Sequence, residues 1–186
     1  MAIVKKLKKK EIVPVILPQF LGGKEIEVIA TDINNLIGKR MILNLIEVLP
    51  ETNKYYVKLI VKINKVEGNK AFAVFDGLEL MRDYVSRMVV RRVRRIDNVQ
   101  DVITKDGIKI RVKTLITTSR KASSKVEKSI RREVNQMVEN SVKNNTLEEF
   151  LNGVFYDNFK KEFTKELIKI YPLRNFEFRK IEVMKA

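Results

Sequence analysis

The stretch VKLIVKINKVEGNKAFAVF, from Val57 to Phe75, decides the fold class. Apolar residues occupy every second position of its first half, from Val57 to Ile63, and lysines stand between them at positions 58 and 62. This period of two is typical of a half-buried β-strand. Gly68-Asn69 then provides a tight turn into a second strand, Ala71 to Phe75. The segment therefore predicts an antiparallel hairpin.

The chain on both sides of this hairpin continues in strands. We expect strands over most of the segment from Ile12 to Phe75, including one from Arg40 to Leu49 that Pro50 closes. Further along, Asp106-Gly107 predicts the turn of a second hairpin, which continues into a strand from Ile108 to Thr117. Apolar residues that alternate with basic ones after position 175 indicate a last strand with a basic tail.

Two helical regions follow the second hairpin. Ser124–Glu127 has the spacing of a capping box, and an amphipathic helix extends from it to about Lys143. Thr146–Glu149 is a second capping box, which opens a further helical region. Gly153 is a candidate break in that region, and Pro172 ends it. Its phenylalanines recur at helical spacing, which favours a place in the core over stacking on bases.

The order of these elements predicts an α+β fold. At 186 residues, the chain is long enough for one sizeable core and short for two. We therefore expect a single domain with a mostly antiparallel, barrel-like sheet, carboxy-terminal helices and basic extensions. The expected boundaries are a basic arm over residues 1–11, the α+β domain over 12–173, and a basic strand or tail over 174–186.

The segment LMRDYVSRMVVRRVRRID, from Leu80 to Asp97, combines a dense arginine cluster with a folded framework. It begins as a helix with Tyr84, Val85 and Met88 on one face. Arginine suits a phosphate-binding surface, because its planar guanidinium group binds phosphate oxygens bidentately and keeps its charge in any environment. The segment predicts contacts with nucleic-acid phosphates. A solvated face laced with ion pairs is the alternative interpretation.

The strand after Gly107 carries a second basic pattern. Lys109, Arg111 and Lys113 share one face of this strand, and their spacing of roughly 7 Å is comparable to that of phosphates. An ordinary polar strand face is the alternative. The complete set of residues that we expect to contact RNA is Arg82, Arg91, Arg92, Arg94, Arg95, Lys109, Arg111, Lys113, Arg120, Lys121, Arg131 and Arg174.

Charge and composition narrow the function classes. The formal net charge of +15 and the pI near 9.9 favour a polyanionic partner, with nucleic acid ahead of an anionic membrane surface. The chain has no cysteine and no histidine, so it lacks the commonest general base and the thiolate ligands of zinc. This weighs against catalysis, and we expect no cofactor. No apolar run approaches a membrane span, so we expect a cytoplasmic protein.

Three other functions have weaker support in the sequence. Gly22-Gly23-Lys24 resembles a phosphate-binding loop but lacks the spacer and terminal hydroxyl of a Walker motif. A metal-dependent nuclease would need several carboxylates in one cleft, whereas Asp97, Asp101 and Asp106 are scattered along the chain. A free-standing RNA- or DNA-binding module would share the basic surface, and it is the leading rival.

Five sequence blocks occur in a fixed order along the chain. They are FLGGKEI (20–26), NLIGK (35–39), LMRDY (80–84) with its arginines up to position 97, TKDG (104–107) with RVK (111–113), and KIYPLR (169–174) followed by RK (179–180). Together they resemble the archaeal and eukaryotic small-subunit ribosomal protein family S-one-e, also called S-three-a-e. The usual run of three arginines is here Val90-Arg91-Arg92 with an added Arg94. The chain lacks the long carboxy-terminal extension of eukaryotic members, which favours an archaeal version.

The resemblance implies a structural component of the small subunit's platform. Members of this family bind ribosomal RNA near its 3′ end and the messenger exit. They lie beside other platform proteins and are accessible to messenger RNA and initiation factors. The resemblance also implies a cytoplasmic, ribosomal location, with no catalytic residues, no metal and no small-molecule substrate.

Overall fold

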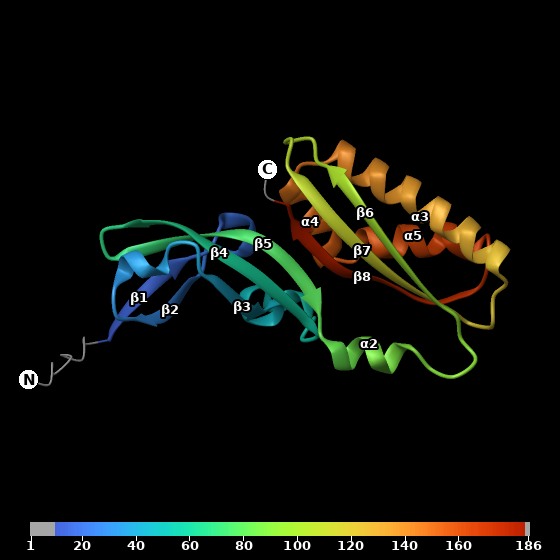
Figure 1. Cartoon of the computed structure of the whole chain (residues 1–186), viewed down its shortest axis with the longest axis horizontal. Helices are drawn as coiled ribbons and strands as arrows, with labels where there is room; N and C mark the ends of the chain where they lie inside the picture. Colours follow the sequence, from blue (N-terminus) through green and yellow to red (C-terminus); the bar gives the residue numbers. More distant parts are fainter. Residues whose placement is uncertain (1–9, 185–186) are drawn as a thin grey trace, which may run out of the picture.

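The computed structural model describes residues 10–184, so most of the expected basic arm lies outside the described residues (Figure 1). Eight strands occur in the described part of the chain: β1 (Glu11–Ile16), β2 (Glu25–Ala30), β3 (Arg40–Asn44), β4 (Val57–Glu67), β5 (Lys70–Leu80), β6 (Arg95–Ile103), β7 (Lys109–Thr118) and β8 (Leu173–Val183). The helices are α1 (Leu45–Val48), α2 (Arg82–Met88), α3 (Ser124–Asn144), α4 (Leu147–Phe155) and α5 (Asn158–Ile168). Short 3-10 turns lie at Gln19–Leu21, Ile33–Leu36 and Pro50–Thr52.

All the strands belong to one sheet, with the order β2-β1-β5-β8-β7-β6 and with β4 and β3 on the other side of β5. The strand pairs are antiparallel except β1 with β5. One edge of β5 is shared, because β1 pairs with Ala71-Phe72 and β8 pairs with Gly77–Glu79. This sharing divides the molecule into an amino-terminal lobe of β1–β5 and a carboxy-terminal lobe of β6–β8 with α3, α4 and α5 (Figure 1).

The expected α+β single domain with a mostly antiparallel sheet is confirmed. Both predicted hairpins are present, with Gly68-Asn69 between β4 and β5, and Asp106-Gly107 between β6 and β7. Gly107 has a φ of 79°, the left-handed conformation that favours glycine. The sheet is open and does not close into the expected barrel, since β2, β3 and β6 each pair with a single strand among residues 10–184.

The predicted strand from Arg40 to Leu49 is wrong in its second half. The strand ends at Asn44, and the four-residue helix α1 follows. The amide of Asn44 donates a hydrogen bond of 3.0 Å to the Glu47 carboxylate, which favours a helical turn. Leu45 and Val48, three positions apart, are both buried on one side of this turn. Helical spacing of these apolar residues overrides the strand pattern.

The predicted capping box of Ser124–Glu127 is also wrong. Ser123 occupies the N-cap position of α3 without a side-chain cap, and the Glu127 carboxylate binds Arg94 instead. The second capping box is present, because Thr146 accepts from the Glu149 N–H and the Glu149 carboxylate accepts from the Thr146 N–H.

The helical region after Thr146 is interrupted at Tyr156-Asp157, between α4 and α5, and not at Gly153. Gly153 lies inside α4, where a Cβ atom would stand 2.3 Å from the ring of Phe159. The glycine is therefore needed for close packing of α4 against α5. The phenylalanines of this region belong to the core, as expected: Phe150 and Phe163 of the helices meet Phe176 and Phe178 of β8.

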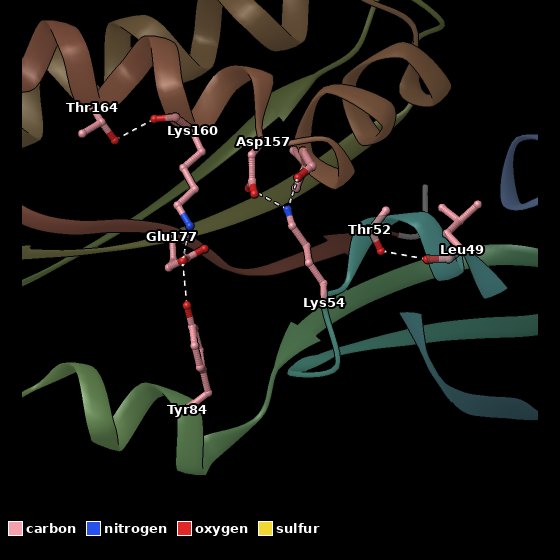
Figure 2. A network of polar contacts seen from close by, with 9 residues as sticks. Leu49, Thr52, Lys54, Tyr84, Asp157, Lys160, Thr164 and Glu177 are labelled. Carbon is pink, nitrogen blue, oxygen red and sulfur yellow. Dashed lines mark hydrogen bonds and ion pairs between the residues drawn. The ribbon is translucent and has the colours of Figure 1, made fainter. Parts of the chain in front are cut away.

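Two buried polar contacts, one from the amino-terminal lobe and one from α2, reach the carboxy-terminal lobe (Figure 2). Lys54, which precedes β4 in the amino-terminal lobe, is 7% exposed. Its ammonium group lies 2.6 Å from the Asp157 carboxylate and 2.9 Å from the carbonyl oxygen of Val154. Both partners belong to the carboxy-terminal lobe. Burying a lysine requires such compensation, so this contact ties the loop before β4 to the junction of α4 and α5.

The second contact centres on Glu177 of β8, which is 6% exposed (Figure 2). Its carboxylate accepts hydrogen bonds from Tyr84 of α2 (3.0 Å) and from Lys160 of α5 (2.6 Å). Burial, and next the Glu177 charge, raise the pKa of the Tyr84 hydroxyl. Burial alone would lower the pKa of Lys160, but the Glu177 carboxylate contributes to a net rise. Glu177 therefore holds α2 against the carboxy-terminal lobe. Helix α2 leads into residues 91–95, which we call the arginine segment.

Candidate nucleic-acid interface

The antiparallel order of β6, β7 and β8 brings three distant basic segments to one end of the carboxy-terminal lobe. The N–H of Thr118, at the end of β7, donates to the carbonyl oxygen of Arg94 at 3.0 Å, directly before β6. The N–H of Ser119 donates to the carbonyl oxygen of Pro172, directly before β8, also at 3.0 Å. These bonds join the arginine segment, the loop after β7 and the start of β8.

We call this region the cationic end. It comprises residues 91–97, residues 119–132 and Arg174. The two ranges contain ten basic residues against two carboxylates, Asp97 and Glu127. The first turns of α3 add Lys125, Lys128 and Arg132, all exposed and absent from the set expected from sequence. Their helical pattern shows an exposed face, but only the fold shows that this face lies beside the arginine segment.

Arg94 supports the fold of the cationic end. Its guanidinium group is hydrogen-bonded to the carboxylate of Glu127, a residue that is only 7% exposed. Its backbone N–H donates to the hydroxyl of Thr118 at 3.0 Å. Arg131 lies 3.9 Å from the same Glu127 carboxylate. Since a buried carboxylate needs a partner, part of the charge of Arg94 is already neutralised.

Arg95 has a similar internal partner. It donates two hydrogen bonds, of 2.8 and 2.9 Å, to the Asp97 carboxylate. Arg179 of β8 lies 3.6 Å from this carboxylate, and Arg131 donates to the Asp97 carbonyl oxygen at 3.4 Å. Asp97 thus gathers three cations from β6, β8 and α3, and it keeps them close together despite their mutual repulsion.

The remaining cations of the predicted set at this end face solvent. Arg91, Arg92, Arg120, Lys121 and Arg174 are exposed, and none of them has an ion pair within residues 10–184. Arg92 adopts a left-handed φ of 67°, which is uncommon outside glycine. A turn at this residue keeps the arginine segment compact between α2 and β6. These five side chains are free to meet phosphates.

The three basic residues on one face of β7, Lys109, Arg111 and Lys113, form a stripe that differs from the cationic end. Lys109 is exposed, but Arg111 makes a bidentate pair with Asp101 at 2.7 and 2.8 Å. The hydrogen bonds from Arg111 lower the pKa of the Asp101 carboxyl. Lys113 lies 2.9 Å from Glu182 of β8. Cross-strand carboxylates therefore neutralise two of the three cations.

Lys180 extends this pattern of alternating charge across the sheet, because it lies 2.8 Å from Glu182 and 3.3 Å from Glu79. Arg82, the remaining member of the predicted set, is exposed at the first residue of α2. The structure therefore brings together eight of the twelve predicted residues at the cationic end. Those outside it are Arg82, Lys109, Arg111 and Lys113.

The carboxylates considered for a nuclease do not converge. Asp97 pairs with Arg95, Asp101 pairs with Arg111, and Asp106 accepts the N–H of Leu147 at the start of α4. No group of three or more acidic side chains in the described part of the chain is arranged to hold a metal ion.

The glycine loop has a structural role. The ammonium group of Lys24 donates to the carbonyl oxygen of Glu47 at 2.9 Å, and Gly22 terminates a 3-10 turn with a φ of 82°. This arrangement does not resemble a nucleotide-binding loop. No helix between residues 10 and 184 has the length and apolar character required to cross a bilayer.

Comparison with known proteins supports the family indicated by the five sequence blocks. The small ribosomal subunit protein eS1 of Methanopyrus kandleri is 40% identical over 118 residues, which cover 63% of this chain and 56% of that protein. The eS1 protein of Saccharolobus solfataricus is 33% identical over 186 residues, which cover 100% of this chain and 89% of that protein. The eS1 protein of Archaeoglobus fulgidus is 33% identical over 175 residues, which cover 91% and 82%. Since the family model also matches residues 1–186, this chain belongs to the ribosomal S3Ae family.

Proposed function

We propose that this protein binds ribosomal RNA through its cationic end and thereby stabilises the platform of the small subunit, near the 3′ end of the RNA and the messenger exit. Family membership makes the chain a structural protein of the small ribosomal subunit and not an enzyme. It also agrees with the expected location on the cytoplasmic ribosome. The finer position on the platform is our proposal.

One observation carries the proposal: three segments far apart in sequence meet at one end of the sheet, and the arginines there without internal partners face solvent. Exposed guanidinium groups release counterions when they neutralise phosphates, and this release drives binding to RNA. We assign the first contacts to Arg91, Arg92, Arg120, Lys121 and Arg174. Arg94, Arg95 and Arg131 contribute charge while they also hold the fold.

The β7 stripe is assigned a secondary role. A phosphate at Arg111 or Lys113 would have to compete with carboxylates already in contact, at Asp101 and Glu182. Lys109 and Arg82 have no such competitor and remain candidates. Neighbouring platform proteins, messenger RNA and initiation factors are the further partners that we propose from the resemblance. RNA shape would guide recognition more than base identity, since the contacts are to the backbone.

The test is the salt dependence of binding to the small-subunit ribosomal RNA. A triple variant, Arg91→Gln, Arg92→Gln and Arg120→Gln, should weaken binding. It should also reduce the slope of log K against log salt by about one for each phosphate that the variant no longer neutralises. Arg94 is left out because its replacement would leave the buried Glu127 carboxylate without its partner.

The matched control removes three charges from elsewhere on the surface. Lys39, Lys58 and Lys161 are exposed and lie outside the cationic end, so their joint replacement by glutamine should reduce the slope less. Equal slopes for the two triple variants would contradict the site assignment. Sedimentation of the native protein in a cell extract separates the ribosomal role from a free-standing RNA- or DNA-binding module, which would not travel with the small subunit.

A further inference from the structure

The free edge of β6 is a feature that the proposed function leaves unused. Among residues 10–184, β6 pairs only with β7. It has nine residues, against six in β2 and five in β3, the other edge strands. It contains no proline, and its pairing with β7 has no bulge. Soluble proteins usually protect an edge strand by keeping it short or by placing a proline or a bulge in it.

Hydrogen bonds at both ends of β6 fix the direction of its backbone groups. The Thr118 N–H donates to the Arg94 carbonyl, and the Thr104 N–H donates to the Ile108 carbonyl. Since alternate residues of an antiparallel strand face the same neighbour, the even-numbered residues turn their backbone groups toward β7. The N–H and C=O groups of residues 99, 101 and 103 therefore point away from the sheet.

Helix α3 and the residue that follows it contact this edge at two points and leave the part between them open. Arg131 donates to the Asp97 carbonyl oxygen at 3.4 Å. Beyond the strand, the Lys105 N–H donates to the Asn145 carbonyl oxygen at 3.2 Å. The open window, Val99–Ile103, spans about 13 Å at the usual rise of a strand, which is the length of a five-residue extended segment.

The outer face of this window is apolar at both of its ends. Asn98 donates to Asn135 of α3, so the even-numbered side chains face the helix and the odd-numbered ones face outward. Val99 and Ile103 are 56% and 55% exposed on the outer face. Asp101 between them is neutralised by Arg111. A strand added here would gain apolar contact on its outer face.

A groove of about 410 Å³ lies between the window and α3. Gln100 lines it, and the Nε2 atom of this residue is buried without a hydrogen-bond partner in the described part of the chain. A buried amide donor without a partner is unfavourable. The charges of Glu139 and Lys143, also in the groove, pair with each other at 2.6 Å. A rotation of the Gln100 side chain toward the groove would present this donor to a neutral side chain that accepts a hydrogen bond.

We propose that an extended segment of a neighbouring protein adds a strand to β6 along Val99–Ile103. Its main chain would bond to the outward N–H and C=O groups of the window. Its outer side chains would be apolar and rest beside Val99 and Ile103, and an inner amide or hydroxyl oxygen would accept from Gln100. We look for the partner within the small subunit because of the proposed function. The open edge of β6 is observed independently of that function.

Photocrosslinking tests this inference in the assembled subunit. The full chain carries benzoylphenylalanine in place of Ile103, is incorporated into small subunits and is irradiated, and the adduct is identified by mass spectrometry. We expect an adduct with one extended segment of another ribosomal protein. The matched control places the same probe at Ile29, which is 68% exposed on β2, and it should not label that segment. An adduct with RNA, an adduct with a second copy of this chain, or no adduct would overturn the proposal.

The variant Val99→Pro gives a more specific test, because it removes an outward N–H that has no partner in the described part of the fold. We expect it to lower the adduct yield at position 103 by about tenfold. Urea unfolding and the salt slope of RNA binding should not change. Val99→Lys keeps the N–H, tests the outer contact and should also lower the yield. An unchanged yield in a folded variant contradicts the inference, while a failure of the RNA proposal would appear in the arginine variants instead.

Discussion

Replacement of Glu177 by leucine should destabilise the protein by about 3 kcal/mol, because the change leaves the charge of Lys160 without its partner at the junction of the lobes. Loss of one partner from a buried pair costs about 3–5 kcal/mol. The Lys160 side chain is 29% exposed, so water compensates part of this cost and the lower end applies. The Tyr84 hydroxyl also loses its acceptor.

The assay is urea unfolding followed by circular dichroism, together with thermal unfolding. For a chain of this size, a loss of 3 kcal/mol lowers Tm by roughly 6–12 °C. The double variant Glu177→Leu with Lys160→Met removes both charges, so it should be more stable than either single variant by at least about 1 kcal/mol. If the double variant instead loses the sum of the single losses, the reasoning from charge pairing is refuted.

A control on α5, the helix that carries Lys160, separates the effect of burial from that of charge. Glu166 and Lys169 of this region lie 2.6 Å apart, but their side chains are 44% and 64% exposed. Replacement of Glu166 by leucine should change the free energy of unfolding by less than about 1 kcal/mol, because exposed pairs contribute little. A loss as large as that of the Glu177 variant would show that burial of the pair is not the cause.

Three further predictions concern stability. Thr146→Ala should lower the free energy of unfolding in urea by about 1 kcal/mol, because it removes the cap of α4. Ser124→Ala removes no cap and should change this free energy by less than about 0.5 kcal/mol. Equal losses would contradict the cap assignment. Gly77→Ala should cost about 1–3 kcal/mol, since its Cβ would lie 2.6 Å from the Ile181 carbonyl oxygen, and a neutral result would disprove close approach of β5 and β8. Burial, and next the charge of Glu177, raise the pKa of the Tyr84 hydroxyl in the folded protein. The hydroxyl therefore loses its proton in the unfolded chain at a lower pH than in the folded protein, so stability should fall as pH rises above about 10. Tyr84→Phe should make this fall less steep in alkaline titration, and an unchanged slope would contradict it.

Local pairing could be predicted from the sequence because its signals are local. The period of two in β4 and the turns at Gly68-Asn69 and Asp106-Gly107 each specify a hairpin within about twenty residues. The place of β8 between β5 and β7 could not be predicted in this way, since about a hundred residues separate β5 from β8. Nor could the requirement for Gly77, which arises only where those two strands meet.

The candidate site shows the same limit in electrostatic terms. A strand such as β7 displays its cations in sequence, but their partners lie on other strands, as Asp101 does for Arg111 and Glu182 does for Lys113. Net charge therefore overstates how many cations are free. In the arginine segment, Glu127 and Asp97 likewise pair with Arg94 and Arg95, whereas Arg91 and Arg92 have no ion pair within residues 10–184. A cation is thus available to phosphate when the fold places no carboxylate beside it. This property can be judged only after the pairing of the strands is known.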